Sequence, residues 1–271
     1  MSLETVAEKG LVLLGCGKMG GAMLAGWLKG GLPPSSVWVL DPHPSDWLKG
    51  TGVHLNDGLP DSPAVAIVAV KPQMMGEALP GLRALGNSTT VFLSIAAGTP
   101  ISAFEAAFGA QSPIIRGMPN TPAAVGRGIT AIVGNPHVGE AGMDLAEALL
   151  SAVGQVARIE TEDQMDAVTG VSGSGPAYVF HLIETLAAAG VAQGLPEDLA
   201  MQLAKATVAG AGALAEGTDE TPTQLRINVT SPNGTTQAAL NVLMDADSGF
   251  PALLPRAVEA ATKRSKELAN G

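Results

Sequence analysis

The N-terminal half of the chain alternates short apolar runs with longer stretches of helical character. The apolar runs are continuous rather than alternating, as is typical of strands that are buried on both faces. They cover residues 11–14, 37–40, 65–70 and 91–95, with two further short runs at 129–133 and 155–159. Residues 19–28 have a helical composition and end at Gly30-Gly31 and Pro33-Pro34, which are helix-stopping signals. Repetition of strand, helix and strand predicts a doubly wound parallel sheet.

From residue 161 onward the strand-like runs disappear, and apolar residues recur at helical spacing. One such set is Val179, Ile183 and Leu186, and residues 199–214 and 253–268 follow the same pattern. Several of these segments are rich in Ala and Gly on more than one face, and a helix that is apolar all round must be buried. A region of about 110 residues has little interior, so we expect a second copy of the chain to cover it. The expected fold is therefore α/β, with the sheet domain at residues 1–160 and an all-helical domain at 161–271.

Composition and charge restrict the class of partner. The 271 residues include 15 Lys+Arg and 25 Asp+Glu, which gives a net charge of −10, and only 3% of them are aromatic. An acidic chain with few stacking side chains is a poor candidate for binding nucleic acid. The longest apolar run, residues 64–70, is far shorter than the roughly 20 residues that span a bilayer, and the first apolar run is too short for a signal peptide. We expect a cytoplasmic protein with neither nucleic acid nor a membrane as partner.

Cysteine and histidine usage argues against a metal centre. Cys16 is the only cysteine, so it can form neither an intrachain disulfide nor a cysteine-rich metal site. The histidines are scattered without ligand spacing, at positions 43, 54, 137 and 181. We therefore expect no metal and a reducing compartment.

A glycine motif follows the first predicted strand and opens the first predicted helix. Its residues are Gly15, Cys16, Gly17, Lys18, Met19 and Gly20, which match G-x-G-x-x-G. The first glycine permits a tight turn, the second lets the backbone approach a pyrophosphate, and the third allows close packing of helix and strand. Because the motif lies between a strand and a helix, it predicts a dinucleotide site; the alternative is a structural turn that binds nothing.

Asp41 lies where the ribose-binding acid of such a site is expected, at the end of the second predicted strand. Its carboxylate would favour a free ribose 2′-hydroxyl over a 2′-phosphate, which leans toward NADH. His43 or Lys49 nearby could partly offset that repulsion. The alternative is that Asp41 only begins an Asp-Pro turn with Pro42.

Three further loops fall at the expected ligand edge of the sheet. Lys71, between Val70 and Pro72, could meet the ribose or the phosphates, although a solvated surface lysine is the usual outcome. The small residues Ala96, Ala97 and Gly98 leave room for a planar ring, and Pro119 and Asn120 belong to a stiff loop that could position a nicotinamide. Each of these segments, taken alone, is only a turn.

The sequence as a whole resembles the Δ1-pyrroline-5-carboxylate reductase family. The motifs that carry the resemblance are the glycine loop, residues 70–72, 94–98 and 118–122, and two later blocks at 166–178 and 228–236. The later blocks, which include Val171-Ser172-Gly173-Ser174-Gly175-Pro176 and Thr230-Ser231-Pro232-Asn233-Gly234-Thr235-Thr236, are the most specific. The family's late loop usually has glycine where this chain has Asn233; asparagine tolerates left-handed backbone conformations, so we expect the turn to survive.

The resemblance implies hydride transfer from NADPH or NADH to the imine carbon of Δ1-pyrroline-5-carboxylate, which gives L-proline in the last step of proline biosynthesis. It also implies a homo-oligomer built from interlocked dimers, a helical domain that serves dimerisation and substrate binding, and an active site completed across the dimer. By resemblance, Thr236 is the catalytic residue, whose hydroxyl meets the imine nitrogen. The alternative reading of Thr236 is that it only caps a helix.

The late loop precedes a predicted helix that begins near Thr236, and backbone N–H groups at a helix start form an anion site. We therefore expect this loop to hold the substrate carboxylate. The expected substrate-binding residues are Ser231, Asn233, Gly234, Thr235 and Thr236.

Two other functions remain open at this level. One is a 3-hydroxy acid dehydrogenase of related layout, although Lys205 lacks the expected surrounding motif. The other is a dinucleotide sensor without turnover. A hydrolase is disfavoured, because Ser174 stands where the second glycine of G-x-S-x-G is required and no strand precedes it.

Overall fold

The computed structural model describes residues 3–87 and 89–269. It divides into two compact units: the sheet unit, formed by Met1–Gly173 with Thr262–Gly271, and the helical unit, Ser174–Ala261. The assignment of domains to residues 1–160 and 161–271 stays a prediction.

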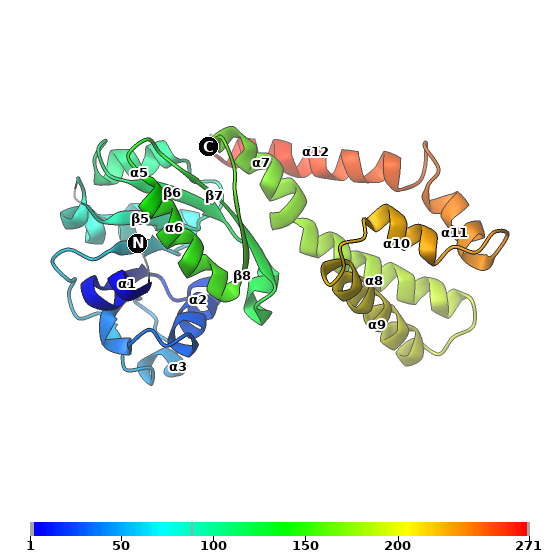
Figure 1. Cartoon of the computed structure of the whole chain (residues 1–271), viewed down its shortest axis with the longest axis horizontal. Helices are drawn as coiled ribbons and strands as arrows, with labels where there is room; N and C mark the ends of the chain where they lie inside the picture. The colour runs from blue at the N-terminus through cyan, green and yellow to red at the C-terminus, as the bar shows by residue number, and fades with distance from the viewer. Residues whose placement is uncertain (1–2, 88, 270–271) are drawn as a thin grey trace. The chain divides into compact units, whose positions relative to one another are not determined.

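The sheet unit is built on eight strands in the order β3-β2-β1-β4-β5-β6-β7-β8. Figure 1 labels β5 to β8 of this sheet. Their bounds are β1 Leu11–Leu14, β2 Val37–Leu40, β3 His54–Leu55, β4 Val65–Val68, β5 Val91–Ser94, β6 Ile114–Met118, β7 Gly128–Gly134 and β8 Gly154–Arg158. The six predicted runs all form strands, and the doubly wound sheet is confirmed. Two strands, β3 and β6, were not predicted, and β6 pairs with β7 in antiparallel fashion while the other pairs are parallel.

Both faces of the sheet are covered, which explains the continuous apolar runs. The helices of this unit are α1 Leu3–Lys9, α2 Lys18–Lys29, α3 Asp46–Lys49, α4 Met75–Ala78, α5 Ile101–Phe108, α6 Glu140–Leu150 and α7 Met165–Val168. Along β1, Leu11 and Leu13 join one buried cluster with α2 and α6, whereas Val12 and Leu14 join another with α5. Successive side chains on a strand point to opposite faces, so each face of β1 is buried against helices.

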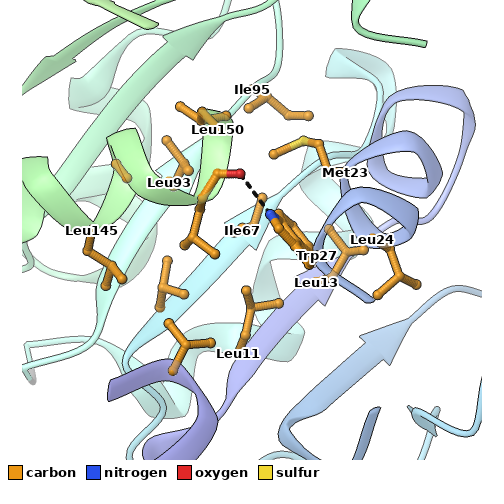
Figure 2. Packing of buried hydrophobic residues seen from close by; sticks show 14 of the residues in the cluster. Leu11, Leu13, Met23, Leu24, Trp27, Ile67, Leu93, Ile95, Leu145 and Leu150 are labelled. Carbon is orange, nitrogen blue, oxygen red and sulfur yellow. Dashed lines mark hydrogen bonds between the residues drawn. The ribbon is translucent and has the colours of Figure 1, made fainter. Parts of the chain in front are cut away.

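Trp27 connects α2 with α6 within the buried cluster that contains Leu11 and Leu13 (Figure 2). Its side chain is only 3% exposed, and its indole Nε1–H donates a hydrogen bond of 2.8 Å to the carbonyl oxygen of Leu149. Because α2 begins at the glycine loop, this contact fixes the far end of the helix that presents the predicted phosphate site.

The helical unit contains α8 Gly175–Ala192, α9 Glu197–Glu216, α10 Pro222–Asn228 and α11 Thr235–Leu243, and no strand occurs within Ser174–Ala261. The helices α8 and α9 run side by side (Figure 1). The buried hydrophobic residues of this unit are the small Ala187, Ala200 and Ala204, and the partly buried Ile183 and Met201 pack against them. Long apolar side chains of the same helices remain exposed, among them Phe180, Leu186, Leu203 and Leu214.

The last helix, α12 Phe250–Ala269, belongs to both units, because residues from Thr262 onward return to the sheet unit. There Ser265 is buried, and its hydroxyl donates a 2.6 Å hydrogen bond to Oδ1 of Asp166. Leu268 lies against Gly98. The two chain segments that form the sheet unit are thus held together by contacts at α7 and at the loop after β5.

Candidate dinucleotide site and substrate loop

The glycine loop connects β1 to α2, and each of its three glycines meets a different constraint. Gly15 has a φ of +89° and lies against Ala69 and Val70. A Cβ at Gly20 would collide with the carbonyl oxygen of Gly15, so this position must lack a side chain for α2 to approach the loop. A Cβ at Gly17 would meet nothing within 4 Å, and Gly17 opens onto a pocket. The loop therefore has the tight turn, the close packing and the open backbone that a pyrophosphate site needs.

The start of α2 offers hydrogen-bond donors to an anion. Gly17 is the N-cap residue, and no side chain of the described residues caps the helix. The first N–H groups of an α-helix have no acceptor within it, and the helix dipole adds partial positive charge there. These groups border the pocket at Gly17 and Lys18, so the residues present fit a dinucleotide phosphate.

The pocket has a volume of about 770 Å³ and gathers residues from three strand ends. Of the residues expected to bind cofactor, it brings together Gly15, Cys16, Gly17, Lys18, Asp41, Val70 and Lys71. Met19, Gly20, Pro72, Ala96, Ala97, Gly98, Pro119 and Asn120 do not line it. It also includes residues that were not expected as cofactor ligands: Gly21, Ala25, Pro42, His43, Ser45, Trp47, Ala69 and Met74. Most of these follow β2 or β4, so their position after a strand is the signal that could have found them.

Asp41 ties the glycine loop to the turn after β2. Its Oδ2 accepts the Cys16 N–H at 2.8 Å, and its Oδ1 accepts the His43 N–H at 2.8 Å. The Asn56 side chain holds the Asp41 backbone, accepting its N–H and donating to its carbonyl oxygen. The hydrogen bond from the His43 N–H forms the Asp-Pro turn that the sequence offered as the alternative role of Asp41. Both oxygens are fixed at the edge of the pocket, so the turn and a role in ribose binding are compatible.

Cys16 lies half-buried within the same loop. Burial and, to a smaller extent, the nearby Asp41 carboxylate raise the pKa of its thiol to about 11. The thiol therefore stays protonated at neutral pH, and at the phosphate site Cys16 presents no negative charge.

Asn120 holds the loop after β6 through contacts inside the protein. Its side-chain amide donates to the carbonyl oxygen of Ser172 at 3.3 Å and to the Ser172 hydroxyl at 3.4 Å, and its Oδ1 accepts the Ile129 N–H at 3.0 Å. Ser172 belongs to a π-helical turn, Thr169–Gly173. The predicted contact of Asn120 with nicotinamide stays a prediction, and its side chain serves first to fix this loop.

The loop after β5 is equally constrained. Ala96 is buried within the apolar cluster on the α5 face of the sheet, and its N–H donates to the Ser94 hydroxyl at 3.3 Å. Gly98 has a φ of +72°. These residues form a narrow turn, and their contact with a nicotinamide ring also stays a prediction.

The candidate substrate loop lies in the helical unit and forms a tight turn before α11. The Gly234 N–H donates to the carbonyl oxygen of Ser231 at 3.0 Å, and Asn233 has a φ of +57°. Proline in the second position followed by a positive φ in the third is typical of a type II turn. Asn233 therefore takes the left-handed conformation that glycine would adopt there.

The position of Thr236 in α11 shows whether this residue caps the helix. Gly234 is the N-cap residue of α11, Thr235 is the first helical residue and Thr236 is the second. Thr236 is partly exposed and does not cap the helix. Thr236 therefore belongs to the first turn of α11, whose N–H groups have no acceptor within the helix.

Comparisons with known proteins cover nearly the whole chain. Residues 162–268 match the family model of pyrroline-5-carboxylate reductase dimerisation, and residues 10–98 match that of NADP oxidoreductase, coenzyme F420-dependent. The pyrroline-5-carboxylate reductase of Synechocystis is 42% identical over 265 residues, which cover 95% of this chain and 97% of that protein. The chain belongs to the pyrroline-5-carboxylate reductase family. Its helical region carries the dimerisation domain of that family.

Solved structures of pyrroline-5-carboxylate reductases share the fold. That from Coxiella burnetii superposes with a TM-score of 0.91 at 33% identity, covering 96% of this chain and 98% of that one. The Plasmodium falciparum enzyme, with NADP bound, gives a TM-score of 0.80 at 29% identity over the same shares. Membership of this reductase family does not favour the 3-hydroxy acid dehydrogenase or the sensor.

No helix in residues 3–87 and 89–269 is both long and apolar enough to cross a bilayer. Over the same ranges, no three His, Cys, Asp or Glu side chains are grouped so that they could hold a metal ion.

Proposed function

We propose that the protein reduces Δ1-pyrroline-5-carboxylate to L-proline, the last step of proline biosynthesis. The observation that carries the proposal is the open backbone at Gly17 in a pocket bordered by Asp41. It occurs in a chain whose relative of 42% identity along nearly its full length is a pyrroline-5-carboxylate reductase.

The sheet unit holds the reduced dinucleotide. When bound, this cofactor supplies a hydride to the imine carbon. The N–H groups at the start of α2 bind the pyrophosphate, and the Asp41 carboxylate accepts hydrogen bonds from the adenosine ribose. Because both Asp41 oxygens are fixed by backbone N–H groups, a 2′-phosphate would meet an immobile negative charge.

This charge favours NADH over NADPH. Lys49, which could have offset it, pairs with Asp46 at 2.9 Å. His43 and Lys71 line the pocket and remain as groups that can attract a phosphate. The preference for NADH is therefore expected to be moderate rather than absolute.

The loop before α11 holds the substrate carboxylate. The N–H groups of the first turn of α11 donate to it, and the hydroxyls of Ser231 and Thr235 assist. The Thr236 hydroxyl lies at the ring nitrogen and donates or relays a proton to it. Reduction then balances: the imine carbon gains a hydride, the ring nitrogen holds a proton, and the C=N bond becomes a C–N single bond.

The active form is a homodimer, and larger assemblies are built from such dimers. Support comes from the dimerisation domain at residues 162–268 and from the long apolar side chains that the helical unit exposes. A cytoplasmic location also stays a prediction.

Reductase activity is tested by following the absorbance of NADH and of NADPH with three additions: pyrroline-5-carboxylate, a 3-hydroxy acid with the oxidised cofactor, and buffer. We expect oxidation only with the imine, at a higher kcat/KM for NADH. Cofactor binding without oxidation would instead identify a sensor, and turnover of the hydroxy acid would identify a dehydrogenase.

A further inference from the structure

Trp47 borders the dinucleotide pocket and is the tryptophan with the most open indole ring. It is 48% exposed, whereas Trp27 is buried and hydrogen-bonded to Leu149, and Trp38 is stacked on His54 with ring centroids 4.4 Å apart. Large aromatic side chains dominate cores and interfaces, because burying their rings is strongly favourable. A half-exposed ring at the edge of a ligand pocket is therefore a candidate contact.

The backbone beneath Trp47 is held in place on both sides. Ser45 caps α3 by accepting the Leu48 N–H at 3.2 Å, and the Leu48 side chain is fully buried in the core. Lys49 pairs with Asp46. The ring of Trp47 is thus presented by a short but anchored helix, so little conformational freedom is lost when a ligand packs on it.

The order of the strands explains why this ring lies beside the glycine loop. In the sheet, β1 lies between β2 and β4, so the segments that follow β2 and β4 flank the loop that follows β1. Trp47 follows β2 and Met74 follows β4, and both line the pocket as exposed apolar side chains. They are the large apolar side chains that border it.

The sequence of binding groups along the pocket sets the position of the base. The proposed function assigns the pyrophosphate to Gly17 and the adenosine ribose to Asp41, so the adenine ring is expected beyond Asp41, away from the phosphates. Trp47 and Met74 border the same pocket as Asp41. A planar base can stack on an aromatic ring whatever hydrogen-bonding groups lie on its edges, because every base has a π face. A methionine side chain is flexible enough to cover a flat ring.

We propose that Trp47 is the stacking surface for the adenine base of the dinucleotide and that Met74 covers the base from the segment after β4. This inference deepens the proposed function, since it rests on the assignment of the pocket to a dinucleotide. The contrasting role for Trp47 is packing alone, because its ring also borders an adjoining hollow with Ala25, Leu28, Gly50 and Thr51.

The test uses the full-length protein and ADP-ribose, which has the adenine, the ribose and the pyrophosphate but no nicotinamide. In Trp47→Leu, which keeps an apolar side chain and loses the π face, the Kd of ADP-ribose should rise about ten-fold or more. In Trp47→Phe it should rise by less than about three-fold, since a smaller ring still stacks. Reduced nicotinamide mononucleotide, which lacks adenine, should lose no affinity through either change.

Fluorescence and kinetics separate stacking from packing. ADP-ribose should quench the tryptophan emission of the wild type and of the control Trp38→Phe, which removes an indole outside the pocket, but not that of Trp47→Phe. In Trp47→Leu the KM for NADH should rise, whereas kcat should stay unchanged. Melting temperatures of all variants are compared to detect damage to the fold.

Two results would overturn the proposal: an unchanged Kd of ADP-ribose in Trp47→Leu, or an equal loss for ADP-ribose and for the mononucleotide. Neither readout needs the imine. A protein that binds ADP-ribose through Trp47 but reduces no imine would therefore contradict the proposed reaction and leave the adenine site in place.

Discussion

The two units of the molecule solve the burial of apolar surface in opposite ways. In the sheet unit many large side chains lie inside, including Phe92, Phe104 and Met23, each at most 1% exposed. In the helical unit the buried hydrophobic residues are alanines, while leucines, valines and both phenylalanines remain on its surface. Contiguous exposed apolar surface marks an interface. The sheet unit is therefore stabilised by its own chain, and the helical unit is expected to be stabilised by another.

Polar interactions follow the same division. The sheet unit buries Arg116 on β6, and its guanidinium donates to Glu162 Oε1 at 2.8 Å. That same oxygen accepts the Ile101 N–H at the start of α5. In the helical unit the pairs are at the surface, as for His181 with Glu184. Long-range polar contacts thus lock the sheet unit, whereas surface pairs add little to the helical unit.

Charging the exposed apolar surface of the helical unit should have the largest effect. Leu203→Asp on α9 places a carboxylate where a second chain is expected to pack, and an unpaired charge in an apolar interface is strongly unfavourable. We expect sedimentation to show loss of the dimer, and imine reduction to fall more than about a hundred-fold.

The control for this substitution is Val125→Asp, which charges an exposed apolar residue of the sheet unit. It should leave the sedimentation coefficient unchanged. Binding of ADP-ribose should survive Leu203→Asp, because the pocket is built within the sheet unit. A variant that remains dimeric would show that this surface is not the interface.

Removing the partner of Arg116 should destabilise the sheet unit alone. Glu162→Ala leaves a guanidinium only 6% exposed without its carboxylate and the Ile101 N–H without its acceptor. The Glu162 side chain is itself 31% exposed, so we expect a loss of about 2–3 kcal/mol in unfolding free energy. Denaturant unfolding measures it, with Asp163→Ala as the exposed neighbour that should cost little. A loss equal in both variants would refute the role of the pair.

Thr236→Ala tests the chemistry assigned to the helical unit. A hydrogen bond that involves a charged group is worth roughly 1.5 to 3 kcal/mol, so turnover should fall about 10- to 100-fold. Thr236→Ser keeps the hydroxyl and should retain most of the turnover. Binding of ADP-ribose and the dimer should be unaffected, and near-wild-type turnover in the alanine variant would remove Thr236 from the mechanism.

The smallest effect expected is on the reactivity of Cys16 in the sheet unit. With a pKa of about 11, its thiolate is scarce at neutral pH, and the greater nucleophilicity of a more basic thiolate offsets this only in part. Alkylation of the folded protein near pH 8 should be about ten-fold slower than that of the urea-unfolded chain, and its rate should climb with pH toward about 11. Protein that has been alkylated should lose ADP-ribose binding, because Cys16 lines the pocket. Equal rates in the folded and unfolded chains would contradict the raised pKa.

Local rules made most of the sheet unit predictable from the sequence. The strands around the glycine loop are uninterrupted apolar runs, and the three glycines belong to a motif that is recognised within residues 15–20. The strand β6 was not predicted because Arg116 and Gly117 interrupt its apolar run. Arg116 can be buried only through Glu162, which lies 46 positions away in the chain. No pattern within the strand reveals such a partner.

The same limit applies to the site. Asp41, which lines the pocket, could be expected there because the distance of the ribose-binding acid from the glycine loop along the chain is nearly constant in such folds. Trp47 and Met74 were not found, since they come together only through the positions of β2 and β4 on either side of β1. The substrate loop was recognised as a turn before a helix, but only the structure shows Gly234 as the cap and frees Thr236 from that role.

The return of α12 to the sheet unit has a consequence for how the protein is made. Ser265 and Leu268, which contact Asp166 and Gly98, leave the ribosome only after the whole of Ser174–Ala261 has been synthesised. At 5–20 residues per second this is a delay on the order of ten seconds. During that time the sheet unit waits without its last helical turns, while the apolar helices that follow it emerge into solvent. The sheet unit is therefore completed after the helical unit has been synthesised, so the exposed apolar side chains of the helical unit are already present when the last contacts of the sheet unit form.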